Sequence, residues 1–382
     1  MRRTKIVATL GPATDKPKVL KNLIEAGLDG ARLNYSHGAR EEHAKRARAV
    51  RRAAKSLNRE VAIIADLQGP KIRIERFRNG PIELEEGDDF IIDADLAPHA
   101  GDETHVGVTY KGLAGDVKAG DTLLVDDGRI MLQVERIDGN AIETVVLLGG
   151  PLSDSKGVNR QGGGLSAKAL TRKDRLDLKH AIEIDADYIA VSFPRSAADI
   201  DDARRLVRKA GGHAGIIAKI ERAEAVDNAE EIIRAADGIM IARGDLGVEI
   251  GDSRLPPVQK QLIDLARHCH RIVITATQMM ESMIEHPMPT RAEVFDVANA
   301  VLDGTDAVML SAETSIGKYP EKTVEAMARI CREAEKEWPD KQAELLLDAA
   351  FERVDQAIAM STIYCANRIK VKAIAALTET GG

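Results

Sequence analysis

The sequence predicts an α/β protein: a (β/α)8 barrel of the TIM-barrel type, with a small β domain inserted into it and a partial α/β domain at the C-terminal end. Two patterns support the barrel. Short apolar runs alternate with amphipathic segments, as in repeated β-α units, and eight such runs can be counted. A third pattern interrupts the third unit: a Gly- and Asp-rich stretch with alternating apolar residues, which predicts the inserted domain.

The eight predicted strands are separated by helix-like segments. They are residues 5–10, 30–34, 61–67, 187–193, 215–220, 238–243, 271–277 and 307–312. Eight successive β-α units favour a closed barrel, and in such barrels the active site lies at the carboxyl ends of the strands.

Ionisable and polar residues gather at or just past these predicted ends. They are Arg32, Asn34, Asp66, Ser192, Lys219, Glu221, Asp245, Thr277, Ser311 and Glu313. A random set of strand ends would carry more turn-forming residues and fewer ionisable groups. The clustering therefore predicts a catalytic site at this end of the barrel.

The inserted domain is expected to span residues 70–165, which leaves 1–69 and 166–340 for the barrel. Its strand-like pieces fit a small β-barrel that closes over the site as a lid. Gly162, Gly163 and Gly164 lie on the return path and would serve as a flexible hinge. A rigid appendage is the alternative.

The last part of the chain is expected to hold a helix over 320–336, a linker around 338–341, a helix over 351–369 and a strand over 372–379. One helix and one strand cannot form a core. Residues 341–382 are therefore interpreted as a fragment of a truncated α/β domain, or as a segment that packs on a neighbour.

The composition, 44% hydrophobic and 30% charged, is that of a globular protein. A net charge of −7 argues against general nucleic-acid binding, and no stretch is long enough to span a membrane. Cys269, Cys331 and Cys365 show no paired spacing. They fit reduced thiols in a cytoplasmic protein rather than a disulfide framework or a zinc site.

Two predicted strands end in charges that could hold a divalent metal beside a phosphate. Lys219 and Glu221 lie two residues apart, so their side chains share one face of the strand. Asp245 follows the next strand and supplies a second carboxylate. For such a pair taken alone, a solvated salt bridge is the alternative.

A series of motifs in order resembles the pyruvate kinase family. They are KIVATLGPAT, ARLNYSHG, ADLQGPKIRI, DDGRI, SDSKGVN, AKIERAEAV, ARGDLGVEI, ATQMMESM and PTRAEVFDVANAVLDGTDAVMLSAET. The resemblance covers nearly the whole chain. It implies a barrel domain, an inserted lid and a C-terminal domain, usually assembled as tetramers. It also implies transfer of a phosphoryl group from phosphoenolpyruvate to ADP, giving pyruvate and ATP in glycolysis.

The resemblance implies roles for single residues. Glu221 and Asp245 match the ligands of Mg2+ or Mn2+, and Lys219 matches the lysine that stabilises the transferring phosphoryl group. Arg32 and Arg73 match arginines near the phosphates, where a guanidinium fork suits phosphate oxygens.

Substrate and nucleotide contacts are implied in the same way. A tight turn is expected after the sixth strand, where backbone N–H groups would receive the substrate carboxylate; its residues are Ala242, Arg243, Gly244 and Asp245. Thr277 matches the threonine that protonates the enolate, through water, and Ser311 would share that relay. The expected nucleotide contacts are Asn34, His37, Arg73, Lys156 and Asn159.

The segment ADLQGPKIRI departs from the pattern of members that require K+. Where those members typically hold Thr, Lys, Glu and Thr, this chain has Leu67, Gln68, Lys71 and Ile74. The Lys71 ammonium could supply the charge that K+ otherwise brings, so the chain resembles the K+-independent branch. No essential K+ is then expected at the equivalent ligands, which are Asn34, Ser36 and Asp66. The alternative is that Lys71 faces solvent.

Two other functions stay open from the sequence. One is a Mg2+-dependent lyase or aldolase that acts on pyruvate or phosphoenolpyruvate with the same architecture. The other is an inactive, truncated fragment that binds without turnover. The lid with Lys156 and Asn159, together with Arg32 and Arg73, favours the kinase, because a lyase does not need them.

Overall fold

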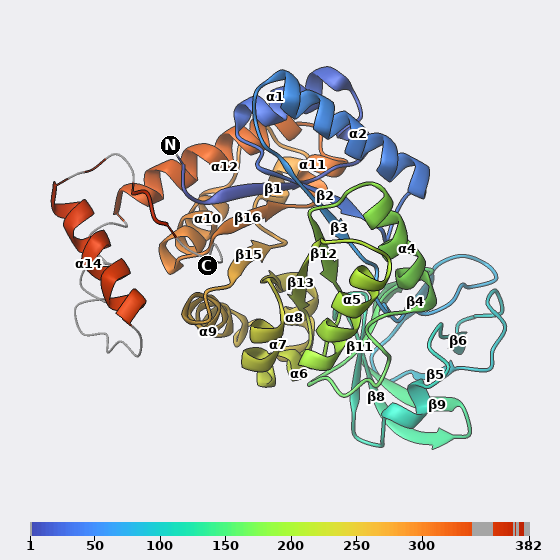
Figure 1. Ribbon diagram of the computed structural model, residues 1–382. Coiled ribbons are helices and arrows are strands. Elements are labelled where there is room, and N and C mark those ends of the chain that lie inside the picture. Colours follow the sequence, from blue (N-terminus) through green and yellow to red (C-terminus); the bar gives the residue numbers. More distant parts are fainter. Residues whose placement is uncertain (1, 338–353, 370, 372–373, 378–382) are drawn as a thin grey trace.

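The computed structural model describes residues 2–337, 354–369, 371 and 374–377. Eight parallel strands close into a barrel that helices surround (Figure 1). The strands are β1 (Lys5–Thr9), β2 (Gly30–Asn34), β3 (Ala62–Asp66), β12 (Tyr188–Val191), β13 (Gly215–Ile220), β14 (Gly238–Ala242), β15 (Ile272–Ala276) and β16 (Ala307–Leu310). All eight lie within the predicted runs, and the predicted barrel is confirmed.

Amphipathic helices cover the outside of the barrel. The main ones are α1 (Pro17–Ala26), α2 (Arg40–Ser56), α4 (Arg172–Glu183), α5 (Ala197–Lys209), α7 (Ala229–Ala235), α9 (Leu255–His268), α10 (Arg291–Asp303) and α12 (Pro320–Ala334). Successive strand residues point to opposite faces. Ile6 therefore packs outward against the helices, whereas Val7 joins Ile217, Met240 and Ile274 in filling the barrel interior.

Four aspartates tie the barrel strands together in pairs at their amino ends. Each aspartate lies immediately before one strand. The four strands are β2, β12, β14 and β16, which alternate with the other four around the barrel. The carboxylate of each aspartate accepts an N–H of the preceding strand of the barrel. The pairs are Asp29 with Ile6 (2.9 Å), Asp187 with Ile63 (2.6 Å), Asp237 with Ile216 (2.7 Å) and Asp306 with Val273 (2.9 Å). We call these four residues the strand-pair aspartates.

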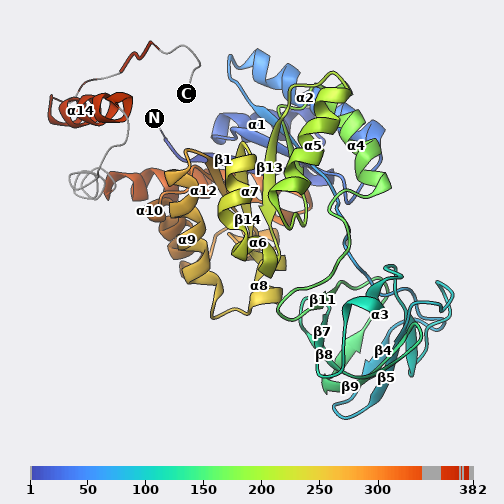
Figure 2. The ribbon, with the colours of Figure 1, turned by 60° about the horizontal axis from the view of Figure 1, so that its bottom comes forward.

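The chain between β3 and α4 forms the predicted β region. Its strands are β4 (Ile82–Leu84), β5 (Asp89–Asp93), β6 (His105–Gly107), β7 (Thr122–Val125), β8 (Ile130–Asp138), β9 (Ala141–Leu148), β10 (Gly150–Leu152) and β11 (Val158–Arg160). They make a six-stranded and a two-stranded sheet around a separate apolar core that includes Phe90 and Leu132. Figure 2 shows this region set apart from the barrel. The domain boundaries stay predictions.

At the C-terminal end, α12 and the short η3 (Glu335–Glu337) cover the first predicted helix, and α14 (Val354–Ile369) falls within the second. The predicted strand over 372–379 is wrong where it can be compared: residues 374–377 belong to no strand. The reason is that none of the described strands pairs with them, and a lone strand leaves its backbone groups unpaired. The rest of that strand and the linker at 338–341 lie outside the described residues. Figures 1 and 2 both show α14 apart from the barrel.

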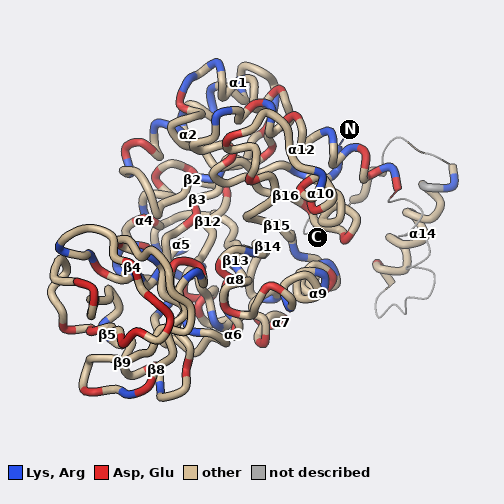
Figure 3. Tube along the Cα trace, turned by 180° about the vertical axis from the view of Figure 1, so that it is seen from behind, with Lys and Arg blue, Asp and Glu red and all other residues tan. Residues whose placement is uncertain are grey.

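Charges of both signs are interspersed along the outer helices (Figure 3). In this view, Lys and Arg positions lie among Asp and Glu positions along most of the described chain. Among the described residues, no helix has the length and apolar character needed to cross a membrane.

Candidate active site

The carboxyl ends of β2, β3 and β13 bring a buried charge network together. Arg32 Nε lies 2.6 Å from Asp66 Oδ2. Lys219 Nζ lies 3.2 Å from Asp66 Oδ1 and 2.8 Å from Glu221 Oε1. All four residues are buried. Lys219 and Glu221 thus face one another as their spacing suggested, but inside the barrel mouth rather than in solvent.

Three residues without a predicted role support this network. Lys219 donates to Ser192 Oγ at 2.7 Å, and Arg32 Nη1 donates to Thr9 Oγ1 at 2.8 Å. The Phe193 N–H donates to Glu221 Oε2 at 2.9 Å. Ser192 was among the polar strand ends, and Thr9 ends the first strand; strand-end position is therefore the signal that could have found both.

Burial and pairing set the charge states in opposite directions. Burial disfavours the charged form of Asp66, but Lys219 and Arg32 outweigh it and hold the pKa of Asp66 below its ordinary value. Burial lowers the pKa of Lys219, but Asp66 and Glu221 raise it to about 12. Burial raises the pKa of Glu221, Lys219 opposes that rise, and nearby Asp245 adds to it. Lys219 is therefore a protonated ammonium.

Lys71 lies at the same mouth and does not simply face solvent. Its Nζ is 3.1 Å from Asp245 Oδ1, and both side chains are half-buried. Two of the side chains at the positions equivalent to K+ ligands have partners within the protein. Asn34 Oδ1 accepts the Ser36 N–H at 3.1 Å, and Asp66 belongs to the charge network. The ammonium of Lys71 therefore neutralises one of the two predicted metal ligands.

The predicted nucleotide contacts are spread over the mouth and the β region. Arg73 Nη1 donates to the Ser155 carbonyl at 2.7 Å, and Lys156 Nζ lies 2.8 Å from Asp126 Oδ1. Burial, followed by the charges of Arg73, Arg32 and Lys71, lowers the pKa of His37. His37 therefore lies close enough to these cations to feel their field.

The tight turn predicted after the sixth strand is wrong. Helix α8 (Arg243–Ile250) begins directly after β14. Leu246 and Ile250 lie four residues apart and are both buried, as on one face of a helix. The first-turn N–H groups of a helix have no partner within it, and they suit an anion. One of them, from Gly244, donates to Thr277 Oγ1 at 2.9 Å.

Thr277 and Ser311 follow β15 and β16 at the same end of the barrel. Thr277 has a left-handed backbone, with φ of +64°, and its hydroxyl donates to the Ala276 carbonyl at 2.7 Å. The Ser311 N–H donates to Glu313 Oε2 at 2.6 Å. The Ser311 hydroxyl is buried without a hydrogen-bond partner, which leaves it able to bind a water or a substrate atom.

The return path of the β region is fastened to the barrel beside this site. Asn159 Nδ2 contacts Glu249 Oε1 at 3.4 Å, and the Gly162 N–H donates to the Glu249 carbonyl at 3.0 Å. Arg222 donates to the Leu165 carbonyl at 2.8 Å. Glu249 is 4% exposed, and this burial raises its pKa to about 7. These contacts join the predicted hinge to a titratable carboxyl group.

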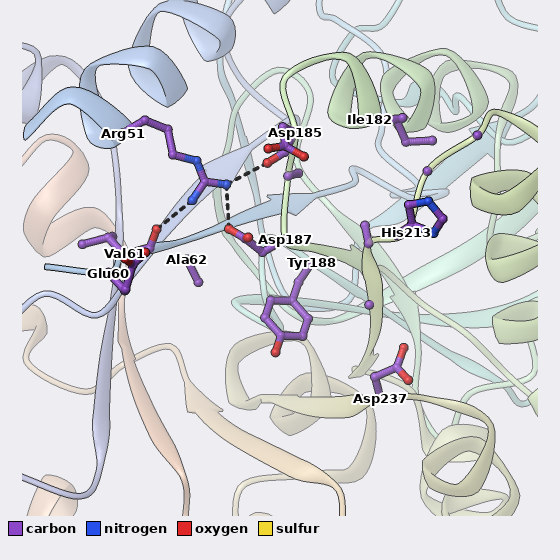
Figure 4. Close-up of a pocket in the computed structure, with 15 residues that line it drawn as sticks. Arg51, Glu60, Val61, Ala62, Ile182, Asp185, Asp187, Tyr188, His213 and Asp237 are labelled. Atoms are coloured by element: carbon purple, nitrogen blue, oxygen red, sulfur yellow. Dashed lines mark hydrogen bonds and ion pairs between the residues drawn. The ribbon is translucent and has the colours of Figure 1, made fainter. Parts of the chain in front are cut away.

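A hollow of about 780 Å3 lies at the opposite end of the barrel from the charge network, at the amino ends of the strands (Figure 4). There Arg51 donates to the carbonyls of Val61 (3.2 Å) and Asp185 (2.8 Å) and pairs with Asp187 at 2.9 Å. None of the predicted site residues lines it. Its charged groups serve the strand pairing described above, so size alone does not mark the active site.

The residues that could hold a divalent metal are Glu221 and Asp245. No three His, Cys, Asp or Glu side chains gather as a metal cluster among the described residues. Mg2+ needs only one or two carboxylates, because it keeps waters and substrate oxygens as its other ligands. Burial is the main cause of the raised pKa of Glu221, and repulsion by Asp245 adds to it; a cation between the two carboxylates would relieve that repulsion. The donor set therefore fits the ion.

A parallel barrel with paired cations and carboxylates at its carboxyl ends belongs to the α/β-barrel enzymes that act on anionic substrates. A family model described as the pyruvate kinase barrel domain matches residues 1–324. The chain belongs to the pyruvate kinase family. The predictions of a pyruvate kinase and of a TIM-barrel enzyme are thereby confirmed, and the lyase alternative is not supported.

Two of the following relatives match over the full length of this chain, and a third matches most of it. It is 57% identical to pyruvate kinase II of Salmonella typhimurium over 385 residues, which cover 100% of this chain and 80% of the relative. It is 55% identical, with the same coverage, to a pyruvate kinase of Haemophilus influenzae. A pyruvate kinase of Mycobacterium intracellulare is 49% identical over 329 residues, which cover 86% of this chain and 69% of that one.

Proposed function

We propose that the carboxyl ends of the barrel strands are where this chain moves the phosphoryl group of phosphoenolpyruvate to ADP. The observation that carries the proposal is the buried network of Arg32, Asp66, Lys219 and Glu221, beside the Lys71–Asp245 pair. The bond from phosphorus to the enol oxygen breaks as a bond to a terminal oxygen of ADP forms. The enolate left behind takes a proton at its methylene carbon and becomes pyruvate.

Positioning and charge neutralisation are the main needs of phosphoryl transfer. Lys219 would face the moving phosphoryl group as an ammonium, and Arg32 would bind its oxygens with the guanidinium donors that Asp66 leaves free. Glu221 and Asp245 would hold Mg2+ or Mn2+, which supplies positive charge to the phosphates when bound. The substrate carboxylate would lie at the start of α8, against backbone N–H groups of Gly244 and Asp245.

Thr277 and Ser311 would complete the reaction by delivering the proton, with water between them and the methylene carbon. The unpartnered Ser311 hydroxyl supports such a relay. On the nucleotide side we propose Asn34, His37, Arg73, Lys156 and Asn159 as contacts. Residues 70–165 would then act as a lid, with 1–69 and 166–340 as the barrel domain and 341–382 as the start of a third domain.

The enzyme is further proposed to work without K+, with the Lys71 ammonium as the substitute charge. Its contact with Asp245, 3.1 Å long, supports a role inside the site. Initial rates in Tris or Na+ buffer, with and without added K+, test this. We expect rates that agree within about twofold, whereas strong K+ activation would contradict the proposal.

A cytoplasmic homo-oligomer is proposed, a tetramer by family resemblance. Large apolar side chains exposed on the described surface support a partner subunit; they include Met288, Phe295 and Ile316. The net charge of −7 makes nucleic acid an unsuitable partner.

Substitution of Lys219 tests the central role. Lys219→Met should lower the rate of ATP formation by about 10³-fold, the effect of losing one transition-state donor. It also leaves Asp66 and Glu221 buried without their cation, so some loss of stability is expected. Lys219→Arg keeps the charge and separates the two effects. Lys179→Met, an exposed lysine on α4, is the control. Full activity in folded Lys219→Met would refute the assignment.

A further inference from the structure

The side chain of Arg243 holds the segment that carries Thr277. Its Nη2 and Nε donate to the Thr277 carbonyl at 2.7 and 3.1 Å, and Nε also lies 3.3 Å from the Ala276 carbonyl. Arg243 is 7% exposed, so water competes little for these bonds. Two consecutive peptide carbonyls are therefore turned toward one guanidinium group.

Asp296 of α10 fixes that guanidinium from the other side. Its two carboxylate oxygens accept from Nη1 at 2.7 Å and Nη2 at 2.8 Å, the fork-to-fork pairing of arginine with a carboxylate. Gln259 of α9 accepts a longer bond from Nη1, at 3.4 Å. All five guanidinium N–H groups are thereby engaged, which fixes both the position and the plane of the group.

The segment that Arg243 holds has a strained backbone. Thr277 and Gln278 have φ of +64° and +54°, in the left-handed region. That region is unfavourable for a β-branched residue such as threonine, so it persists only where the surroundings impose it. The conformation directs the Thr277 hydroxyl to the start of α8, where it accepts the Gly244 N–H at 2.9 Å.

We propose that Arg243, braced by Asp296, is a positioning residue that places the Thr277 hydroxyl for proton delivery to the enolate. The inference rests on the role proposed above for Thr277, and it adds to that role what keeps the hydroxyl in place. Arg243 acts through Thr277 and not on the substrate with its own side chain. A lysine at this position keeps the charge but not the planar fork, so it cannot hold both carbonyls and Asp296 together.

The chain offers a matched control for the brace. Asp303, also on α10, pairs with Lys260 of α9 and, among the described residues, makes no hydrogen bond or ion pair with Arg243, Thr277 or Gln278. Asp296→Asn and Asp303→Asn each weaken one ionic contact of α10, the first with Arg243 of α8 and the second with Lys260 of α9. Only the first loosens Arg243. Because the Asp296 side chain is 34% exposed, water can reach the amide that replaces its carboxylate.

The test separates proton transfer from the rest of the reaction. Exchange of pyruvate methyl hydrogens with D2O is followed by NMR in the presence of Mg2+ and ATP, beside KM for phosphoenolpyruvate, kcat and the melting temperature. We expect Asp296→Asn and Arg243→Lys to slow exchange about 10- to 100-fold, with KM changed by less than about threefold. Asp303→Asn should stay within about twofold of the unchanged enzyme.

Equal exchange rates in Asp296→Asn and Asp303→Asn would overturn the inference while leaving the proposed function standing. If Arg243→Lys does not fold, Asp296→Asn decides, because it leaves the guanidinium in place. Unslowed exchange in Thr277→Val would overturn the role of Thr277, and the positioning role with it. An unchanged enzyme without turnover of phosphoenolpyruvate and ADP would refute the proposed function itself.

Discussion

At the scale of single residues, the site is governed by charges that burial would disfavour on their own. Lys219 loses hydration in the barrel mouth and is compensated by Asp66 and Glu221. Glu249 lacks such compensation: burial dominates its environment, Glu224 adds repulsion, and the Ala223 N–H and Arg222 oppose the rise only in part. The two cases differ in how well close partners of opposite charge offset burial, and so their charge states differ.

Glu249 should make stability depend on pH near neutrality. Its pKa in the folded protein is about 7, above the ordinary 4.5, so the folded state keeps a proton that the unfolded chain releases. The resulting stabilisation is complete below the ordinary value and is lost as pH rises through 7. We expect the free energy of unfolding to fall from about pH 5 to about pH 8 by up to ~3 kcal/mol more than in Glu249→Gln.

Urea unfolding at both pH values measures this difference. Glu325→Gln, at an exposed glutamate on α12, is the control. Parallel pH profiles for the unchanged protein and Glu249→Gln would contradict the assignment.

At the scale of elements, the three glycines of the predicted hinge, Gly162, Gly163 and Gly164, are not equivalent. All three have positive φ, but an added Cβ meets nothing at Gly162, whereas at Gly163 it would come within 2.6 Å of Glu224 Oε2. Gly162→Ala should therefore cost only the backbone strain of about 1 kcal/mol, and Gly163→Ala roughly twice that. Thermal unfolding of the two variants measures the difference. Equal losses would show that Glu224 moves aside freely.

The strands were the most predictable elements. Their apolar runs are short and rich in β-branched residues. Alternate residues pack on the outer and inner sides of the barrel wall, as Ile6 and Val7 do. Helix α8 was missed because glycines mask its periodicity. The strand over 372–379 was predicted from local propensity, whereas a strand forms only where another strand pairs with it.

The site could be predicted where one strand decides the geometry, and not where distant elements do. The spacing of Lys219 and Glu221 fixes their common face. The direction of Arg243 depends on Asp296, which lies 53 positions further along the chain. The position of Thr9 and Ser192 at strand ends is a local signal, whereas their pairing with Arg32 and Lys219 follows from the register between strands.

At the scale of the whole molecule, the β region lengthens one closing step of the barrel. Asp187 joins residues 124 positions apart, whereas Asp237 joins residues 21 apart. Loop closure of that longer segment costs about 1.5 kcal/mol more. Each aspartate also pairs with one arginine, Arg51 or Arg204, at 2.9 Å, so the two sites are closely matched.

Asp187→Ala and Asp237→Ala should therefore lose similar stability, about 1–3 kcal/mol, but differ in folding rate. We expect Asp187→Ala to refold about tenfold more slowly than Asp237→Ala, because the long segment then closes without its amino-end bond. Stopped-flow refolding compares them. Equal rates would mean that the β region folds first and brings its two ends together.

The strand-pair aspartates also mean that strand alignment is maintained at one rim of the barrel, the amino rim. The same hydrogen bond from a backbone amide to an aspartate carboxylate occurs in four pairs of neighbouring strands, so it fixes the strand register at four places on the amino rim. The loops at the opposite rim therefore do not have to fix the strand register. They can lengthen, accept a whole inserted domain or exchange side chains while the scaffold keeps its alignment. The carboxyl-end loops can therefore vary in sequence and length while the amino-end bonds keep the strands aligned.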